Sequence, residues 1–501
     1  MPANFLHGVE TIELDIGPRA IRQVKTAVVG LVGTAPMFDV DPANRTLNSI
    51  QIVTNDRDAR LYFGANREGF TIPRALDAIF DQGTGIVLVV NVLDLETDTT
   101  TVATPTTGTG NFTFDADGVI KITDLDEDDP IRRYGLSAVE VKSGDGTVTH
   151  VLNTDYTIQA AEGTIKRVPG GAIAALSSVR VGYTFVDPTD VTNSDIIGTV
   201  DGSGNRTGMQ AFLDSYNLFG MYPKILIAPV FSPQTSITTE LNVLAHKFRA
   251  IAMVDAPIGT TFQAAITGRG PLGSINFNTS SERLVLCYPH LKVYDIATDT
   301  EDLEPMSQRL AGVMCAKDQE RGYWWSPSNT EFKGIVGTER RLTAMINDPT
   351  SEVNMLNEVG ITTMFNSFGT GMRSWGNRTA AWPVLTHPRN FINIRRVADV
   401  IHESVEYSML QFIDYPINAA LIDAVTESVN GFLRTLVVRG AIIDGECSYD
   451  PTKNPAVALS LGHLTFDIRF MPPPPAERMT FESFIDISIL NQLGRSIREA
   501  A

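Results

Sequence analysis

Two continuous apolar stretches separated by a helical pattern constrain the fold of this chain more than any other feature. Residues 26–34 (TAVVGLVGT) and 85–93 (GIVLVVNVL) have the composition of strands that are buried on both faces. Between them, residues 73–81 start with a proline, which suits the first turn of a helix, and place Leu76 and Ile79 on one side. Strand, helix and strand in this order form a βαβ unit. We therefore expect an α/β core with a parallel sheet.

The alternation of strand and helix patterns resumes in the second half of the chain. Helical patterns occur at residues 210–219, 236–249 and 305–318, and strand patterns occur at residues 223–229, 250–255, 283–287 and 290–293. Because 501 residues exceed what one hydrophobic core organises, we expect several domains. We assign residues 25–93 and 201–372 to one α/β core that is interrupted by an insert.

The predicted insert covers residues 94–200, where the composition changes abruptly. This segment contains no Trp, Met or Cys, and its 17 acidic and 7 basic residues supply −10 of the chain's net charge of −18. Short alternating segments separated by turns such as Asp117-Gly118 predict a small all-β sandwich or barrel in an exposed position. These segments are residues 111–114, 118–122, 138–141, 148–152, 156–159, 163–168 and 179–185. Glycines in the return linker at 202–208 are expected to let the insert swing.

The C-terminal third combines long helices with two late strand patterns. We expect helices within residues 390–413 and 417–439 in a C-terminal α/β domain that covers residues 373–462. His402, Glu403 and Glu406 lie about one helical turn apart, which is typical of a solvated face. Residues 463–470 and 478–490 alternate as the two strands of a hairpin around a run of four prolines, which is stiff. We assign residues 463–501 to this hairpin and a terminal arm.

Residues 1–24 do not form a compact unit by themselves. Four apolar residues follow one another at mixed spacings of two and three residues, and Gly17 and Pro18 close the segment. The four are Val9, Ile12, Leu14 and Ile16. A single strand of this length has no partner within its own segment, so we assign residues 1–24 to an extended N-terminal arm.

No motif for catalysis or for a cofactor is recognisable. Residues 30–34 lack the Lys-Ser/Thr of a Walker loop, and the seven histidines are scattered without metal-ligand spacing. The acidic residues 124–129 lack EF-hand spacing, which leaves a solvated loop or a weak cation site. A Ser-His-Asp set is open on residue counts alone, but no Gly-x-Ser-x-Gly elbow marks a nucleophile. We therefore expect no enzymatic activity, no metal and no cofactor.

Charge, cysteines and hydropathy exclude several classes of partner and location. A net charge of −18 repels phosphate, so we do not expect nucleic acid as a partner. Cys287, Cys315 and Cys447 are isolated, which predicts buried thiols in a reducing compartment. The N-terminus has no signal-peptide pattern, and no apolar run approaches the roughly 20 residues that span a bilayer. We expect production in the cytoplasm and no membrane insertion.

Two tryptophan-containing patches are candidates for more than ordinary packing. Residues 322–329 (GYWWSPSN) place two tryptophans beside a turn, and residues 374–379 (SWGNRT) place a tryptophan, an asparagine and an arginine around another. Large aromatic residues of this kind either fill a core or anchor an interface between subunits. Both interpretations stay open at this point.

The same patches carry a resemblance to a known family. Together with other segments in the same order along the chain, they resemble the contractile tail sheath proteins of phages and R-type bacteriocins. The other segments are residues 17–19 (GPR), 26–36 (TAVVGLVGTAP), 334–340 (GIVGTER), 351–358 (SEVNMLNE), 393–399 (NIRRVAD) and 472–479 (PPPPAERM). The resemblance covers nearly the whole chain except the insert at 94–200.

This resemblance implies a structural role in a virion tail, with assembly in the host cytoplasm. It implies a middle domain of subtilisin-like fold without catalysis, and hexameric rings stacked helically around a tail tube protein, between baseplate and tail terminator proteins. Contraction would drive the tube through the host envelope. The resemblance also implies that both terminal arms cross to neighbouring copies and complete sheets there by strand addition.

We assign the inter-subunit strands, the hinges and a tube contact on this basis. The arm strands carry Val9, Ile12, Leu14, Ile16, Leu464, Phe466, Ile468, Phe481, Phe484 and Ile487, and the hinges are Gly17, Pro18, Pro472 and Pro475. Arg395 and Arg396 on the long predicted helix are candidates for gripping the tube by charge pairs; the alternative is that they form ion pairs within the chain. Rival interpretations are a hydrolase with a carbohydrate-binding β insert, or the sheath of a bacteriocin or secretion-type injection machine.

Overall fold

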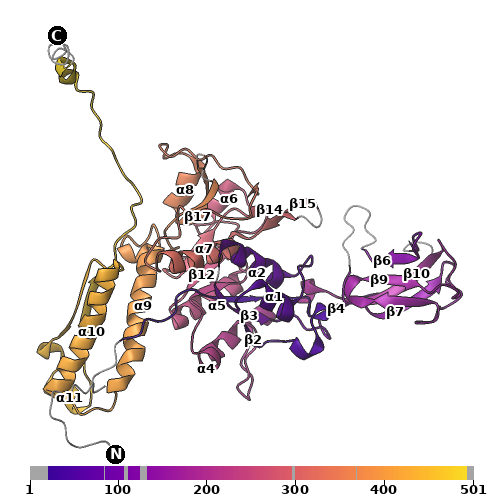
Figure 1. Ribbon diagram of the computed structural model, residues 1–501, viewed down its shortest axis with the longest axis horizontal. Helices are drawn as coiled ribbons and strands as arrows, with labels where there is room; N and C mark the ends of the chain where they lie inside the picture. Colours follow the sequence, from indigo (N-terminus) through magenta and orange to yellow (C-terminus); the bar gives the residue numbers. More distant parts are fainter. Residues whose placement is uncertain are drawn as a thin grey trace, which may run out of the picture.

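The largest unit of the structure, a computed structural model, is an eight-stranded sheet (Figure 1). The structure describes residues 21–83, 85–106, 111–123, 133–295, 299–367, 369 and 371–492. In sheet order the strands are β18 (Gly371–Trp375), β17 (Ile361–Ser367), β13 (Leu284–Cys287), β12 (Ile251–Asp255), β11 (Ile225–Ile227), β1 (Val28–Gly33), β3 (Ile86–Asn91) and β2 (Ile50–Val53). The six central strands are parallel, and β18 and β2 are antiparallel edges. The expected α/β core and the parallel pairing of β1 with β3 are confirmed.

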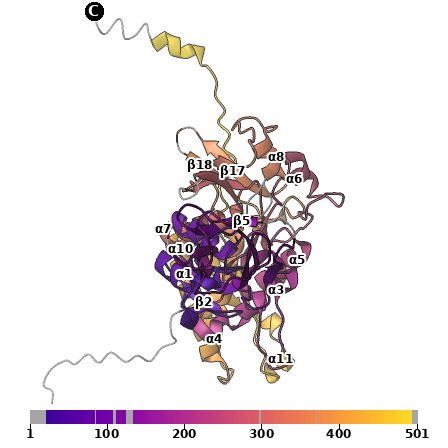
Figure 2. The same ribbon diagram turned by 90° about the vertical axis from the view of Figure 1, so that its right-hand side faces the viewer.

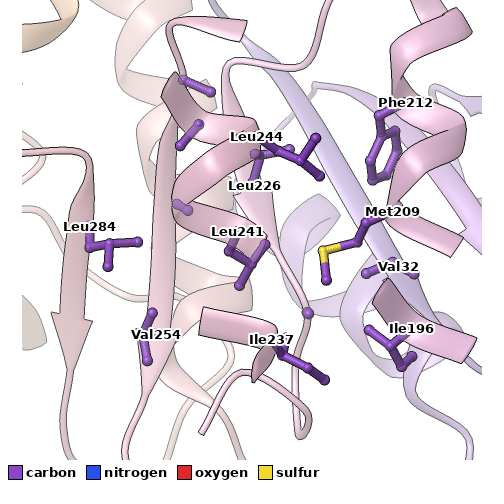
Figure 3. Packing of buried hydrophobic residues seen from close by; sticks show 14 of the residues in the cluster. Val32, Ile196, Met209, Phe212, Leu226, Ile237, Leu241, Leu244, Val254 and Leu284 are labelled. Atoms are coloured by element: carbon purple, nitrogen blue, oxygen red, sulfur yellow. The ribbon is translucent and has the colours of Figure 1, made fainter. Parts of the chain in front are cut away.

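Helices cover both faces of this sheet, because alternate residues of each buried strand point to opposite sides. On one face, Val29 and Leu31 of β1 pack against α2 (Thr71–Gln82) and α7 (Met306–Glu320). On the other face, Val28 and Val32 pack against α3 (Asn193–Ile197), the 3₁₀ segment η5 (Gly208–Asp214) and α5 (Thr235–Phe248). Figure 3 shows this second face, where Leu241 and Leu244 of α5 approach Leu226 and Val254. Both faces of the eight-stranded sheet are therefore buried.

Short helices and small strands complete the core around this sheet. The helices are α1 (Asp56–Phe63), α4 (Ser215–Phe219), α6 (Phe262–Thr267) and α8 (Glu352–Glu358), and the strands are β14 (Leu291–Asp295), β15 (Thr300–Glu304) and β16 (Gly337–Thr338). The helix expected at 210–219 is in fact η5 followed by the single-turn helix α4. The Ser215 hydroxyl donates to the Phe212 carbonyl over 2.7 Å at their junction, a local bond that competes with regular helix geometry.

The acidic insert folds as two small sheets around its own core. One sheet contains β4 (Thr99–Val102), β5 (Asn111–Thr113), β7 (Ser137–Ser143) and β10 (Ser178–Val186), and the other contains β6 (Val119–Lys121), β8 (Tyr156–Gln159) and β9 (Thr164–Arg167). The strand expected at 148–152 is shortened to residues 148–150, which pair with β7: the Ser143 amide donates to the Val148 carbonyl and the His150 amide donates to the Val141 carbonyl, both over 2.8 Å. The Asp155 carboxylate accepts a bond from the Val151 amide over 2.8 Å, and Asn153 has a φ of 64°, so the chain turns after His150.

Arg67 joins the insert to the core. Its guanidinium bonds to Asp39 of the core over 2.5 and 2.8 Å and to Glu162 of the insert over 2.9 Å. The same group lies 4.7 Å from the ring centre of Tyr134 in the insert and 5.7 Å from that of Phe38 in the core. This joint opposes the swinging motion that the glycines at 202–208 suggested.

The C-terminal part consists of two long helices and a two-stranded sheet. The helices are α9 (Ile392–Met409) and α10 (Ala419–Arg439), the strands are β19 (Asp444–Tyr449) and β20 (Phe466–Met471), and the short helix α11 (Ala456–Ser460) lies between the strands. Both helices and one face of the sheet enclose a separate apolar core. Among the described helices, none is long and apolar enough to cross a bilayer.

Helix α9 is attached to the α/β core by a row of ion pairs. The pairs are Arg396–Asp318, Asp399–Arg283, Glu403–Lys224 and Glu406–Arg249. Lys224 directly precedes β11 and Arg283 directly precedes β13, so α9 crosses the amino-terminal ends of the parallel strands. The solvated face expected around Glu403 is therefore wrong, because this side chain is only 10% exposed.

Burial of the Glu403–Lys224 pair shifts the pKa of both groups. Desolvation raises the pKa of Glu403 and lowers the pKa of Lys224, while the charge of each partner opposes the change. Two charges in this situation stabilise the fold only together, since either one alone would be buried without compensation.

Removing one charge of this pair is expected to destabilise the protein strongly. Glu403→Ala leaves the Lys224 ammonium buried and unpaired, which should lower the free energy of unfolding by about 3–5 kcal/mol. Glu406→Ala breaks a pair whose carboxylate is 60% exposed and should cost about 1 kcal/mol or less. Urea unfolding followed by tryptophan fluorescence measures both variants. Equal stability of the two would contradict the role of the buried pair, and Lys224→Met combined with Glu403→Leu should restore most of the loss.

Candidate assembly surface

The first described residues of the chain lie along α9, far from it in sequence. The amides of Arg22 and Val24 donate to the hydroxyls of Ser408 and Ser404, over 3.3 and 3.2 Å. Ile21 and Val24 also pack against the apolar core of the C-terminal part. The chain therefore runs past the C-terminal end of α9 before it enters β1.

The last part of the chain leaves the body at the opposite end of α9. After β20 ends at Met471, Pro472 is buried and the Pro473 carbonyl accepts a bond from Asn393, near the start of α9, over 3.3 Å. Arg378 then binds both carboxylate oxygens of Glu477. Residues 472–477 are thus fastened at two points.

Arg378 is itself held firmly in place. Its guanidinium lies 3.8 Å from the ring centre of Trp382 and 4.2 Å from that of Phe391, and it donates to the Asn390 side chain over 2.9 Å. We call Arg378, Trp382, Asn390, Phe391 and Glu477 the take-off clamp. Stacking between two rings fixes the plane of the guanidinium, which therefore fixes the direction in which Glu477 leaves the body.

Beyond the clamp the chain has no regular structure until the 3₁₀ segment η9 (Ile487–Gln492). Figures 1 and 2 show this part, which we call the C-terminal arm (residues 478–492), projecting away from the molecule. Its apolar side chains are almost entirely exposed. The exposed fractions are 73% for Met479, 87% for Phe481, 85% for Phe484, 93% for Ile485 and 75% for Ile487. Such a row of exposed apolar side chains marks an interaction site.

The hairpin expected from the sequence does not form. β20 pairs in antiparallel fashion with β19, and residues 478–486 pair with no strand of the described chain. The intervening prolines lack N–H groups and prefer an extended path, so they favour departure over reversal. Phe466 and Ile468 lie on β20 and pack against the helices, Leu464 precedes this strand, and Phe481, Phe484 and Ile487 lie on the exposed arm.

The hinge and N-terminal assignments have different outcomes. Pro472 and Pro475 lie between the two fastening points, so the free path begins only after Glu477 and not at the prolines. The predicted hinge residues Gly17 and Pro18 lie outside the described residues. The four apolar residues of the N-terminal arm also lie outside them: Val9, Ile12, Leu14 and Ile16.

Arg395 and Arg396 are bound within the chain. Arg396 is 6% exposed and pairs with Asp318, and Arg395 is 11% exposed and pairs with Glu282 and Asp399. Their burial contradicts a direct grip on a tube and agrees with the intramolecular alternative.

The tryptophans of the two patches pack against neighbouring rings but stay at least partly exposed. Trp324 packs edge-on against Tyr323, with ring centres 5.2 Å apart, and Trp375 stacks on Phe365 at 4.8 Å. Trp325 differs because it is 46% exposed. The surprise in these segments is Arg378, whose part in the clamp was not recognised from the sequence although its motif was singled out.

A cavity of about 710 Å³ lies at the carboxyl ends of the parallel strands, where α/β enzymes place their active sites. It is lined by Asp255 and His290 among others. Asp255 accepts bonds from the Ser232 hydroxyl over 3.2 Å and from the Ser307 amide over 2.9 Å, and His290 faces Glu339 at 3.6 Å. No described hydroxyl or thiol bonds to His290, so the described part of the cavity has no serine–histidine or cysteine–histidine pair.

Comparison with known proteins decides the family. The model for the phage tail sheath protein central domain matches residues 204–380, and the model for the phage tail sheath C-terminal domain matches residues 386–486. The tail sheath protein of Burkholderia phage BcepMu is 48% identical over 487 residues, which cover 97% of this chain and 98% of that protein. The chain belongs to the phage tail sheath protein family. The tail sheath protein of Escherichia phage P2 is 26% identical over 495 residues, covering 99% of each chain.

A solved assembly shares the fold of this tail sheath protein. The helical sheath of the anti-feeding prophage in its contracted state matches with a TM-score of 0.58 and 15% identity, over 97% of this chain and 100% of that one. The relatives are structural tail sheath proteins and not enzymes, which argues against the hydrolase alternative. The C-terminal family model includes α9, α10, the two-stranded sheet and the first part of the arm.

Loss of the take-off clamp is expected to release the arm from its fixed direction. Arg378→Ala removes two charge-assisted hydrogen bonds and two ring contacts, about 2 kcal/mol of anchoring at this partly exposed position. Spin labels on Thr435→Cys and Thr480→Cys in the unassembled protein should then give a broader distance distribution. The native cysteines are buried and should stay unlabelled. Arg389→Ala, which removes a nearby exposed arginine, is the control and should leave the distribution unchanged.

Proposed function

We propose that this tail sheath protein polymerises as stacked hexamers around a tail tube and contracts to drive the tube through the host envelope. In this proposal neighbouring copies are linked by terminal arms that add strands to one another. The observation that carries it is the C-terminal arm, an extended segment whose large apolar side chains are 73–93% exposed from Met479 to Ile487.

Strand exchange explains the arm and the two-stranded sheet together. An isolated pair of strands is marginal in water and leaves main-chain donors and acceptors unpaired at its edges. Adding a strand from another copy pairs those groups and buries the apolar side chains of the arm. Because the donor and acceptor surfaces differ, the contact is heterologous and repeats without closing, which builds a helical tube. Several links per copy make the assembly hard to dissolve.

Contraction requires that the folded bodies of the subunits move while the terminal arms keep neighbouring copies linked. New contact between bodies that buries about 400 Å² of apolar surface per copy would release about 10 kcal/mol. A high kinetic barrier must then keep the extended sheath from contracting prematurely. The tail tube, the baseplate and the tail terminator are the proposed partners, with no nucleic acid and no membrane insertion. Assembly would take place in the host cytoplasm, and the identity to a phage relative favours a virion tail over a bacteriocin.

The apolar side of the arm is expected to be essential for polymerisation. Phe481→Ser, Ile485→Ser and Ile487→Ser together should leave a folded subunit that forms no cylinders, because these side chains are exposed in the single copy. Replacing Thr480, Glu482 and Ser488 on the other side by alanine is the matched control and should preserve assembly. Negative-stain microscopy and sedimentation distinguish the outcomes. Cylinders of normal length from the triple serine variant, or from a chain lacking residues 1–20, would contradict arm exchange.

The insert is expected to be dispensable for assembly. It lies on the opposite side of the core from α9, α10 and the two-stranded sheet (Figure 1). Replacing residues 96–199 by a short flexible linker should therefore leave cylinders that are narrower but otherwise normal. Failure to polymerise, with circular dichroism showing a folded core, would show that the insert forms a contact between copies.

A further inference from the structure

The cavity beside Asp255 and His290 lies where two chain connections diverge. Asp255 is the last residue of β12, and His290 follows β13 by three residues. The connection after β12 leads to α6 on one face of the sheet, whereas the connection after β13 leads to α7 on the other face. Adjacent parallel strands whose connections leave on opposite faces form a crevice at their carboxyl ends, and α/β proteins bind small ligands in this crevice.

Two helices begin at this crevice, and only one of them meets a carboxylate there. The amide of Ser307, in the first turn of α7, donates to the Asp255 carboxylate over 2.9 Å. No described side chain caps α5, and no described residue accepts a hydrogen bond from the amides of Thr235 and Ser236 in its first turn. Gln234 and Thr235 line the cavity. The open end of α5, which carries about half a positive charge, therefore faces the cavity.

Asp255 and His290 form a polar floor with unused capacity for hydrogen bonds. Asp255 is 2% exposed, and its carboxylate accepts bonds from Ser232 and Ser307, whereas a carboxylate has about four acceptor sites. His290 is 8% exposed, and its ring forms no hydrogen bond with any described residue; the Glu339 carboxylate lies 3.6 Å away. Buried polar groups in proteins are nearly always hydrogen-bonded. The floor therefore suits a group that donates several hydrogen bonds.

The charges around the cavity select a ligand that carries both signs. None of the described residues that line it is a lysine or an arginine, and Asp255 would repel phosphate or another simple anion. A simple cation would satisfy Asp255 but would face the positive end of α5. Desolvation raises the pKa of Asp255, so an adjacent ammonium group would favour its ionised form. A zwitterion meets both requirements, because its ammonium group can bind the floor while its carboxylate binds α5.

The floor and the helix end lie close together, which limits the ligand to a short zwitterion. The Ser232 hydroxyl donates to the Asp255 carboxylate, and the Ser232 carbonyl accepts a bond from the Thr238 hydroxyl of α5 over 2.8 Å. One residue thus joins the floor to the start of α5. An α-amino acid carries its ammonium group and its carboxylate on the same carbon atom, as this spacing requires, whereas the two ends of a peptide are further apart.

Apolar side chains at the mouth of the cavity suit an aliphatic side chain on the ligand. Val230 and Ile258 line the cavity but are 60% and 64% exposed, which places them at its mouth. Val230 has a φ of 71°, a strained conformation for a β-branched residue and one that is found most often at functional sites. Residues 270–278 supply another wall, which is held in place because Arg269 donates to the Phe277 carbonyl over 2.7 Å.

We propose that this cavity binds a free aliphatic α-amino acid, with its ammonium group on Asp255 and His290 and its carboxylate on the first amides of α5. Such a site belongs to the folded single copy and does not depend on arm exchange. Because the ligand would contact the ends of β11, β12 and β13 only in the folded chain, it would also stabilise the core by mass action.

An NMR titration of the unassembled full-length protein tests the class of ligand. The probes are L-leucine, isoamylamine, which lacks the carboxylate, and isocaproate, which lacks the ammonium group. We expect both partial ligands to bind at least about ten-fold more weakly than L-leucine, because each loses one set of charge-assisted hydrogen bonds. Equal binding of either partial ligand would overturn the proposal. So would the absence of binding by L-leucine, L-isoleucine and L-methionine at about 20 mM.

Thr235→Pro tests the place of the carboxylate. Proline suits the first position of a helix but lacks the N–H group, and Gln234 already has the extended backbone, with φ −76° and ψ 131°, that precedes a proline. We expect about ten-fold weaker binding of L-leucine. Ala419→Pro, at the first position of α10, is the matched control and should leave the affinity unchanged. Unchanged affinity in folded Thr235→Pro protein would contradict a carboxylate at the start of α5.

The ring signals of His290 locate the ligand in the unaltered protein. L-leucine should shift these signals, which are identified by their loss in the spectrum of His290→Gln. Binding of L-leucine without a shift of the His290 signals would place the ligand elsewhere and overturn the proposal. This measurement decides the site even if Thr235→Pro fails to fold.

Discussion

The row of ion pairs along α9 is the interaction on which the rest of the structure depends. Charged pairs that are this buried contribute little net stability compared with apolar packing, but they tolerate only one alignment of the two parts. Asp399 and Glu403 each meet one basic residue at the amino end of a parallel strand, so α9 has a single register across the sheet. Residues 21–24 and 472–477 both contact this helix. The ion pairs of α9 therefore also set where these two segments lie on the body.

Local sequence patterns predicted most of the secondary structure. The apolar runs at 26–34 and 85–93 became β1 and β3, and the helical periodicity at 236–249 and 390–413 became α5 and α9, because burial on a sheet or helix leaves a periodic trace. Patterns failed where a distant contact decides. The segment 148–152 alternates like a strand, but the Asp155 carboxylate bends it. The domain boundaries expected from the sequence stay a prediction.

The assembly surface was predictable in outline but not in detail. The alternation at 478–490 suggested a hairpin with residues 463–470, and this prediction is wrong, because alternation does not name the strand with which a segment pairs. β20 pairs with β19 instead, and no periodicity in either segment indicates this pairing. Arg378 is a single polar residue whose role depends on a carboxylate 99 residues away. Such roles leave no periodic trace, and only the arrangement in space shows them.

The path of the chain along α9 has a mechanical consequence. The described N-terminal residues pass beside Ser408 and the C-terminal segment passes beside Asn393, so these two segments of one copy are separated by nearly the whole helix, about 20–25 Å at 1.5 Å per residue. In the proposed assembly, each body would act as a stiff bar that is linked to other copies at either end. A network of stiff bars that are joined at their ends must become wider when it is shortened. Shortening of the sheath and loosening of its hold on the central tube would then be one motion. No separate release step would be needed.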